Sequence, residues 1–215
     1  MQTETGLSLR LGSSAIGAQT SGAQVSIEDI QESIEDPQTS DSVATDSGYT
    51  QISSLFDFEV HGLNAMRSTA KVIIPLSINL PVNAVYRKYD SISGWNNFVE
   101  DSKNTIKSAN RIEGICPELM NEAYINGLQA FTNCLELTIE DGGPNDADGL
   151  VNGVIVDPGG IAIPNSNTPD SLIESNLAQV AASNEGVEAG GSSAFNLMFL
   201  GLLLIAGLVP FVKPK

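Results

Sequence analysis

Residues 134–140 read CLELTIE and run directly into DGGPNDADGLVNGVIVDPGG at 141–160. The two leucines and the isoleucine of the first part alternate with two glutamates and a threonine, the period of a strand with one apolar face. The second part is rich in glycine, asparagine, aspartate and proline, which favour tight turns. The stretch therefore predicts β-structure with turns, and it decides the fold.

Similar short patterns occur elsewhere in residues 1–163. Further strands are predicted at 56–62, 72–76, 84–89, 154–156 and 161–163. Pro75 indicates an edge strand or a strand end, because proline cannot donate to a ladder. Such short strands separated by turn residues predict an all-β, antiparallel β-sandwich over 49–163. Residues 1–48 are predicted as an acidic, Ser/Thr-rich and partly β region, with a long loop or disorder near 33–47.

The chain is strongly acidic, with 10 Lys+Arg against 26 Asp+Glu and a formal net charge of -16. Nucleic acid and anionic lipid headgroups require positive charge on the protein, so we expect no nucleic-acid partner. A negative surface does suit calcium, whose ligands are carboxylate and carbonyl oxygens.

Oxygen-bearing side chains crowd the loop after residue 140. The predicted calcium ligands are Asp141, Asn145, Asp146, Asp148, Asn152 and Asp157. Asp146-x-Asp148-Gly149 matches the middle of an EF-hand, but Pro144 and Ile155 occupy two of the ligand positions, so the hypothesis is a non-EF loop site of the thrombospondin-repeat type. The alternative is that these residues form tight turns between strands.

The two cysteines, Cys116 and Cys134, permit one disulfide worth about 3 kcal/mol by loop closure. Two unpaired thiols are the alternative. Their spacing fits no zinc pattern, and His61 is the only histidine, so a Cys/His metal site is not expected.

Residues 194–212 read AFNLMFLGLLLIAGLVPFV and carry no charge, long enough for a helix to span about 30 Å of hydrocarbon. No face of such a helix would be polar, which argues against a buried core helix. We therefore predict a transmembrane anchor with a short basic end. Its marker residues are Ala194, Leu200, Leu204, Val212, Lys213 and Lys215. Because positive charge stays on the cytoplasmic side, the preceding residues are expected outside and the C-terminus in the cytoplasm.

Residues 164–193 are polar, small and acidic, and they predict a spacer. The spacer ends in Gly190, Gly191, Ser192 and Ser193. This order of glycines, apolar helix and basic end resembles the GlyGly-type C-terminal sorting signals of Gram-negative bacteria. The resemblance implies processing at Gly190, Gly191 and Ser192 by a rhomboid-family intramembrane protease. A plain flexible linker is the alternative.

The N-terminal residues MQTETGLSLRLG have neither a basic start nor an apolar core, so they do not form a signal peptide. We expect the chain to be the distal part of a longer exported protein. The alternative is a tail-anchored adaptor that faces the cytosol.

Residues 49–163 resemble the bacterial choice-of-anchor U domain. The resemblance lies in DGGPNDADGLVNGVIVDPGG, AVYRKYDSISGWNNFVED, the Ile115-Cys116-Pro117 step and CLELTIED. It implies a surface-exposed β domain next to the anchor of a larger exported protein, without an established catalytic activity. It also favours pairing Cys116 with Cys134.

No nucleophile elbow or phosphate loop occurs, and His61 is interpreted as an ordinary strand residue, so we expect no enzyme. The leading hypothesis is a non-catalytic surface module that presents an upstream region, with calcium as the candidate ligand. An adhesion or glycan-binding module is the alternative, in which Trp95, Tyr86 and Tyr89 stack on sugars; packing of at least two of them into the core is the simpler expectation.

Overall fold

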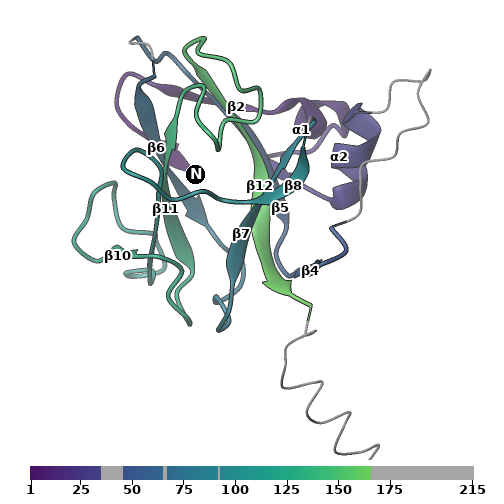
Figure 1. Cartoon of the computed structure of the whole chain (residues 1–215). Coiled ribbons are helices and arrows are strands. Elements are labelled where there is room, and N and C mark those ends of the chain that lie inside the picture. The colour runs from purple at the N-terminus through teal and green to yellow at the C-terminus, as the bar shows by residue number, and fades with distance from the viewer. Residues whose placement is uncertain (35–45, 65–66, 92, 166–215) are drawn as a thin grey trace, which may run out of the picture. The chain divides into compact units, whose positions relative to one another are not determined.

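The computed structural model describes residues 1–34, 46–64, 67–91 and 93–165, and Met1–Asn165 forms one compact unit of two antiparallel β-sheets (Figure 1). The β11 sheet has the order β1 (Gln2–Thr3), β6 (Thr69–Pro75), β11 (Cys134–Glu140), β9 (Thr105–Ala109) and β10 (Ile125–Asn126). The β12 sheet has the order β2 (Ser8–Leu11), β5 (Leu55–His61), β12 (Val154–Pro164), β7 (Val85–Asp90) and β8 (Gly94–Asn97), with β3 (Gln24–Val25) on β5 and β4 (Tyr49–Gln51) on β12. The predicted all-β sandwich is confirmed. The predicted membrane helix and residues 166–193 of the predicted spacer lie outside the described residues, while Pro164, where the spacer was predicted to begin, ends β12.

The core lies between the inner faces of the two sheets. Leu135, Leu137 and Ile139 of β11 are at most 1% exposed, and they share one cluster with Phe56 and Phe58 of β5. The alternation read from residues 134–140 is therefore confirmed, because its apolar side chains all point into the sandwich. Burial of such side chains contributes roughly 1.5–3 kcal/mol each relative to exposure.

Strand β12 corrects one prediction. Residues 154–156 and 161–163 were expected as separate strands around a Pro-Gly turn, but they belong to a single strand. Gly159 pairs with Phe56 of β5 on one side and with Lys88 of β7 on the other. A Cβ at Gly159 would lie 2.7 Å from a ring carbon of Tyr86 and 2.8 Å from the carbonyl oxygen of Arg87. The glycine thus allows close strand packing instead of a turn.

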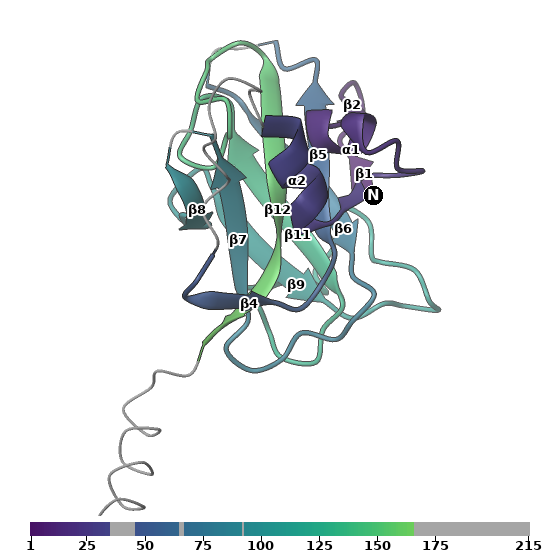
Figure 2. The same cartoon turned by 90° about the vertical axis from the view of Figure 1, so that its right-hand side faces the viewer.

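Two short helices, α1 (Ser13–Gly17) and α2 (Ile27–Ile34), cover the outer face of the β12 sheet (Figure 2). Ala15 and Ile30 are fully buried there with Leu55 and Tyr89. Residues 1–48 were predicted as an acidic, partly β region, and these two helices, of 5 and 8 residues, were not predicted. The sequence signal for α2 is a capping box formed by Ser26 and Asp29. The Ser26 N–H donates to Asp29 Oδ2 at 2.7 Å, and the Asp29 N–H donates to Ser26 Oγ at 3.1 Å.

Asp57 of β5 holds the first of these helices in place. Its Oδ2 accepts hydrogen bonds from the backbone N–H groups of Ser14 (2.7 Å) and Ala15 (3.1 Å). Gly12, just before the helix, donates its N–H to the Asp57 carbonyl at 3.0 Å. A Cβ at Gly12 would lie only 2.0 Å from Asp57 Oδ1, so a side chain there would displace the carboxylate that caps the helix.

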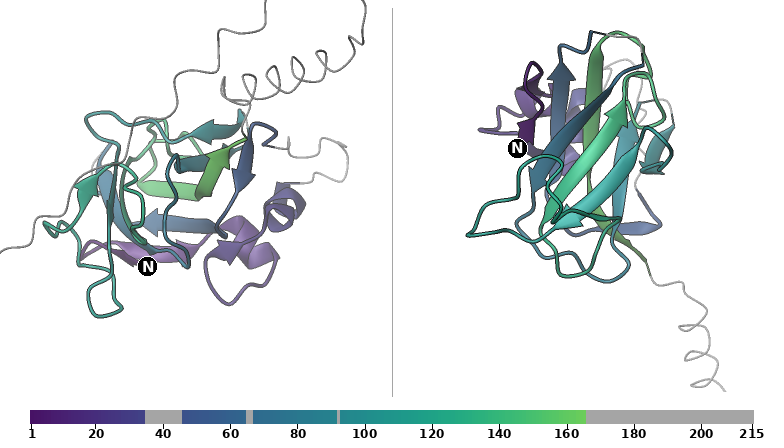
Figure 3. Two further views of the ribbon diagram at one scale, coloured as in Figure 1. Left: turned by 90° about the horizontal axis from the view of Figure 1, so that it is seen from below. Right: turned by 90° about the vertical axis from the view of Figure 1, so that its left-hand side faces the viewer.

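The segment between β9 and β11 packs against part of the outer face of the β11 sheet (Figure 3). Cys116 of this segment forms a disulfide with Cys134 of β11, and their Cα atoms are 5.6 Å apart. Cys134 is fully buried beside Ile73, Ala109 and Tyr124. The disulfide predicted from the sequence is confirmed, and it fastens this segment to the sheet.

Gly12→Ala is expected to destabilise the protein by about 1–3 kcal/mol, because the new methyl group occupies the position of the Asp57 carboxylate. Gly17→Ala is the matched control: Gly17 is the last residue of the helix that Gly12 precedes, and a Cβ there meets no atom within 4 Å. It should leave stability within about 0.5 kcal/mol of wild type. Urea unfolding of both variants measures the difference; equal midpoints would contradict the role of Gly12.

Candidate functional site

Five of the six predicted calcium ligands lie in the loop between β11 and β12. Asp141 opens this loop and is fully buried. Its Oδ1 accepts hydrogen bonds from the backbone N–H groups of Asn152 (3.1 Å) and Gly153 (3.0 Å). Its Oδ2 is buried and accepts no hydrogen bond. One carboxylate oxygen therefore closes the loop, and the other is an orphan acceptor.

The next two predicted ligands tie the loop to its surroundings. Asp146 accepts the N–H of Gly142 on Oδ2 at 2.8 Å and the N–H of Val156 on Oδ1 at 2.9 Å. Asn145 makes two hydrogen bonds with the backbone of Val99. Its Oδ1 accepts the Val99 N–H, and its Nδ2 donates to the Val99 carbonyl, both at 2.8 Å. These contacts join the loop to the start of β12 and to the segment after β8.

The remaining two lie on the outer side of the loop. Asp148 Oδ1 accepts the Leu150 N–H at 2.8 Å, and Asp148 Oδ2 accepts a side-chain N–H of Asn152 at 2.9 Å. Asn152 Oδ1 in turn accepts the Val154 N–H at 2.8 Å. Such hydrogen bonds from Asp and Asn side chains to nearby groups are typical of tight turns, which were the alternative to a metal site.

In the part of the chain that the structure describes, no group of three or more His, Cys, Asp or Glu side chains is arranged to hold a metal ion. Asp141 Oδ2 is nevertheless a buried acceptor without a donor. The calcium site stays a prediction, and Asp141 is the residue from which a test starts.

Asp157, the sixth predicted ligand, lies elsewhere. It points from β12 into the space between the sheets and is fully buried, with Lys88 Nζ of β7 at 2.7 Å from its Oδ1. The Tyr86 hydroxyl donates to the same oxygen at 3.5 Å. Burial raises the pKa of the Asp157 carboxyl, and Lys88 opposes that shift. Burial and the nearby Asp157 raise the pKa of Tyr86 well above its ordinary value, so this hydroxyl stays a donor.

The sequence reasoning did not single out Lys88. The signal was nevertheless present, because alternation places Lys88 on the same face as Tyr86 in β7, and Asp157 on the same face as Ile155 in β12. Both neighbours on that face are core residues. A charged residue at an apolar position on each of two strands indicates a buried ion pair.

The aromatic residues considered for glycan stacking are largely internal. Tyr86 and Tyr89 are buried, and Trp95 packs edge-on against Tyr89 with ring centroids 5.4 Å apart. Packing of at least two of the three was the simpler expectation, and it is confirmed. His61, at the end of β5, lies 2.6 Å from Glu59 and occupies an ordinary strand position.

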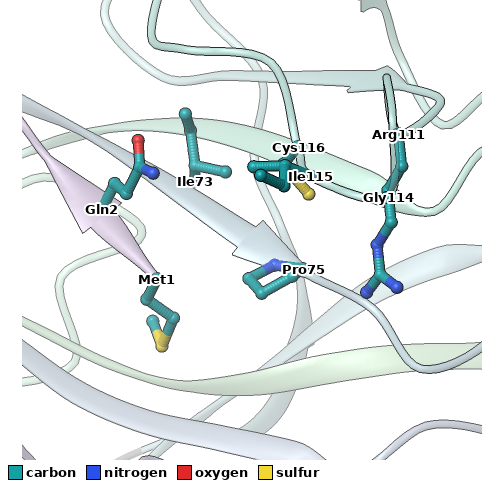
Figure 4. Close-up of a pocket in the computed structure, with 8 residues that line it drawn as sticks. All are labelled: Met1, Gln2, Ile73, Pro75, Arg111, Gly114, Ile115 and Cys116. Atoms are coloured by element: carbon teal, nitrogen blue, oxygen red, sulfur yellow. The ribbon is translucent and has the colours of Figure 1, made fainter.

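An open pocket lies beside the disulfide, between β1, β6 and the segment that carries Cys116 (Figure 4). Met1, Ile73, Pro75 and Ile115 give it an apolar lining, and Arg111 supplies a cation at its rim. Arg111 already donates to the Leu76 carbonyl at 2.8 Å. The pocket thus presents no acid–base pair for catalysis.

Comparison with known protein families, with curated proteins and with solved structures found no match. Among the described residues, no helix is long and apolar enough to cross a membrane. The predicted anchor at 194–212, its lysines, and the processing residues Gly190, Gly191 and Ser192 all lie outside the described residues.

Asp146 predicts a pH dependence of stability. Burial is the main cause that raises its pKa to about 6. An acid whose pKa is raised on folding holds its proton more tightly in the folded state, so its contribution to stability is lost as pH rises from about 4 to about 6. Wild type should therefore lose stability over this range relative to Asp146→Asn, measured by urea unfolding in the presence of EDTA.

Asp148→Asn is the control, since it removes a carboxylate from the same loop at a half-buried position. The charge of Asp148 is a smaller cause of the raised Asp146 pKa than burial, so this variant should keep most of the wild-type dependence of unfolding free energy on pH. If the unfolding free energy of the wild type and that of Asp146→Asn change equally with pH, Asp146 does not cause the pH dependence.

Proposed function

We propose that this chain is the membrane-proximal part of an exported bacterial protein: a non-catalytic β domain that presents an upstream region at the cell surface or in the periplasm. The observation that carries the proposal is the Cys116–Cys134 disulfide. Disulfides form and persist in oxidising compartments and are rare in the cytosol. A domain that relies on one is suited to a place outside the cytoplasmic membrane.

Three features of the sequence support the same location. The uncharged residues 194–212 provide a membrane anchor, and Lys213 and Lys215 provide its cytoplasmic end. The spacer at 164–193 separates the domain from the bilayer. The resemblance to the choice-of-anchor U domain carries the same expectation, and Gly190-Gly191-Ser192 is the proposed cleavage region for a rhomboid-family sorting protease.

The proposal predicts the compartment of the domain. Protease added to intact spheroplasts should cut the exposed spacer and release a fragment that antibodies against residues 1–165 detect in the supernatant. A cytosolic marker protein that stays intact is the control. A domain that remains in the pellet until the cells are lysed would support the tail-anchored cytosolic adaptor instead.

The redox state of the cysteines gives an independent measurement. Cells lysed into a thiol-blocking reagent should yield protein whose cysteines react with a mass tag only after reduction. The Cys116→Ala/Cys134→Ala variant, which has no thiol, sets the unlabelled mobility. Tagging without prior reduction would place the domain in a reducing compartment.

We further propose that the loop from Asp141 to Asn152 binds calcium. The orphan oxygen of Asp141 and the net charge of -16 support this. Calcium at about 100 times its dissociation constant should stabilise the fold by about 2.7 kcal/mol, reversibly with EDTA. Thermal melts with calcium, with magnesium and with EDTA measure this; Asp141→Asn should abolish the response. Identical wild-type melts in calcium and in EDTA would remove the ion from the proposal.

A further inference from the structure

Lys88 and Asp157 lie on neighbouring antiparallel strands and face the same side. Lys88 of β7 pairs in register with Gly159 of β12, and Asp157 stands two residues from that glycine. Side chains in this diagonal relation are within reach of each other when one of them is long. Tyr86 and Ile155, which share the same face, both belong to the core between the sheets.

The contact between the two side chains is short and dry. Lys88 Nζ lies 2.7 Å from Asp157 Oδ1, and the two side chains are 6% and 0% exposed. Of the ion pairs in the described residues, none other has both partners below a tenth exposed. A buried pair of charges is costly unless hydrogen bonds satisfy both partners.

Here those hydrogen bonds are incomplete. Lys88 Nζ is buried and is not aligned for a hydrogen bond with any group, although it lies so close to Asp157 Oδ1. Asp157 Oδ2 is also buried and accepts none. The amine is thus held 2.7 Å from one carboxyl oxygen in a closed core, and this enforced proximity favours a reaction between the two groups.

Two neighbours shape the contact. The buried Tyr86 hydroxyl donates to Asp157 Oδ1 at 3.5 Å. Gly159 leaves the space that this needs, because a Cβ there would lie 2.7 Å from the Tyr86 ring and 3.0 Å from Asp157 Oδ1. A donor aimed at a carboxyl oxygen stabilises the negative charge that develops there when an amine attacks the carbon.

We propose that Lys88 and Asp157 condense into an intramolecular isopeptide bond between Nζ and Cγ. A proton first passes from the ammonium to the carboxylate across the 2.7 Å contact, giving an amine and a carboxylic acid. The nitrogen lone pair then attacks Cγ, Tyr86 donates to the oxygen that becomes negative, and one carboxyl oxygen leaves as water with two protons. The products are a secondary amide and one water molecule, so the step needs no oxidant, metal or second substrate.

The surroundings favour the product over the reactants. Condensation replaces two buried charges with a neutral amide, and so removes their desolvation cost. The core around Phe58, Ile155 and Ile161 is closed to solvent, which keeps water from reversing the reaction. The resulting bond joins β7 to β12 and encloses the chain segment that contains the Cys116–Cys134 disulfide.

The test is the intact mass of the purified full chain after reduction and alkylation of its cysteines. The folded protein should be lighter than its sequence by one water molecule. Proteolysis and fragment spectra should yield a branched peptide joining Lys88 to Asp157. The fragment spectra are essential, since a succinimide at Asp141-Gly142 or Asp148-Gly149 also loses one water. A folded wild-type chain at its full sequence mass, or a water loss confined to an Asp-Gly step, would overturn the proposal.

Variants assign the bond to its residues. Lys88→Met combined with Asp157→Leu replaces the pair with apolar side chains of similar size, which preserves a foldable core, and it should restore the full mass. Lys107→Met is the matched control, because the partly exposed Lys107 lies 3.8 Å from the buried Glu136, and it should keep the water loss. Water loss that persists in the Lys88→Met/Asp157→Leu variant would overturn the assignment. The readout is mass alone, so it is independent of where the domain resides.

Discussion

The apolar contact between the inner faces of the two sheets is the constraint on which everything else depends. Leu135, Leu137 and Ile139 from β11 meet Phe56 and Phe58 from β5 across this interface. Side chains alternate along a strand, so once these residues face inward, the residues between them face outward. The outward-facing residues then bind what covers the outer faces of the sheets. Cys134 forms the disulfide with the segment before β11, and Leu55 packs against the two helices.

The packing of this acidic chain buries several carboxylates, and their partners are either backbone N–H groups or a lysine. Asp57, Asp141 and Asp146 accept backbone N–H groups at helix and loop ends, where donors would otherwise be unsatisfied. Asp157 receives a lysine instead, because the middle of a paired strand has no spare backbone donors. The first arrangement organises local chain geometry; the second places reactive groups in the core.

Sequence reasoning succeeded where a local pattern carries the information. The alternation at residues 134–140 located β11 and its buried face, and the cysteine count indicated the disulfide. It was wrong at Pro158-Gly159-Gly160, because turn residues inside a strand are explained only by the neighbouring strands that press against them. It also missed α1, whose cap comes from Asp57, far away along the chain. Alternation marks Lys88 and Asp157 as inward-facing, but their pairing depends on strand order, which no local pattern reveals.

The central place of β12 has a mechanical consequence. Asn165, directly after it, is fastened to the start of β4: its N–H donates to the Gly48 carbonyl at 2.9 Å, and its side chain donates to the Ser47 carbonyl. A force that enters the domain through this residue pulls along β12, which has β5 on one side and β7 on the other. The ladder bonds on both sides are then sheared together instead of being peeled one by one. The strand that ends the domain is therefore also the one best placed to bear tension.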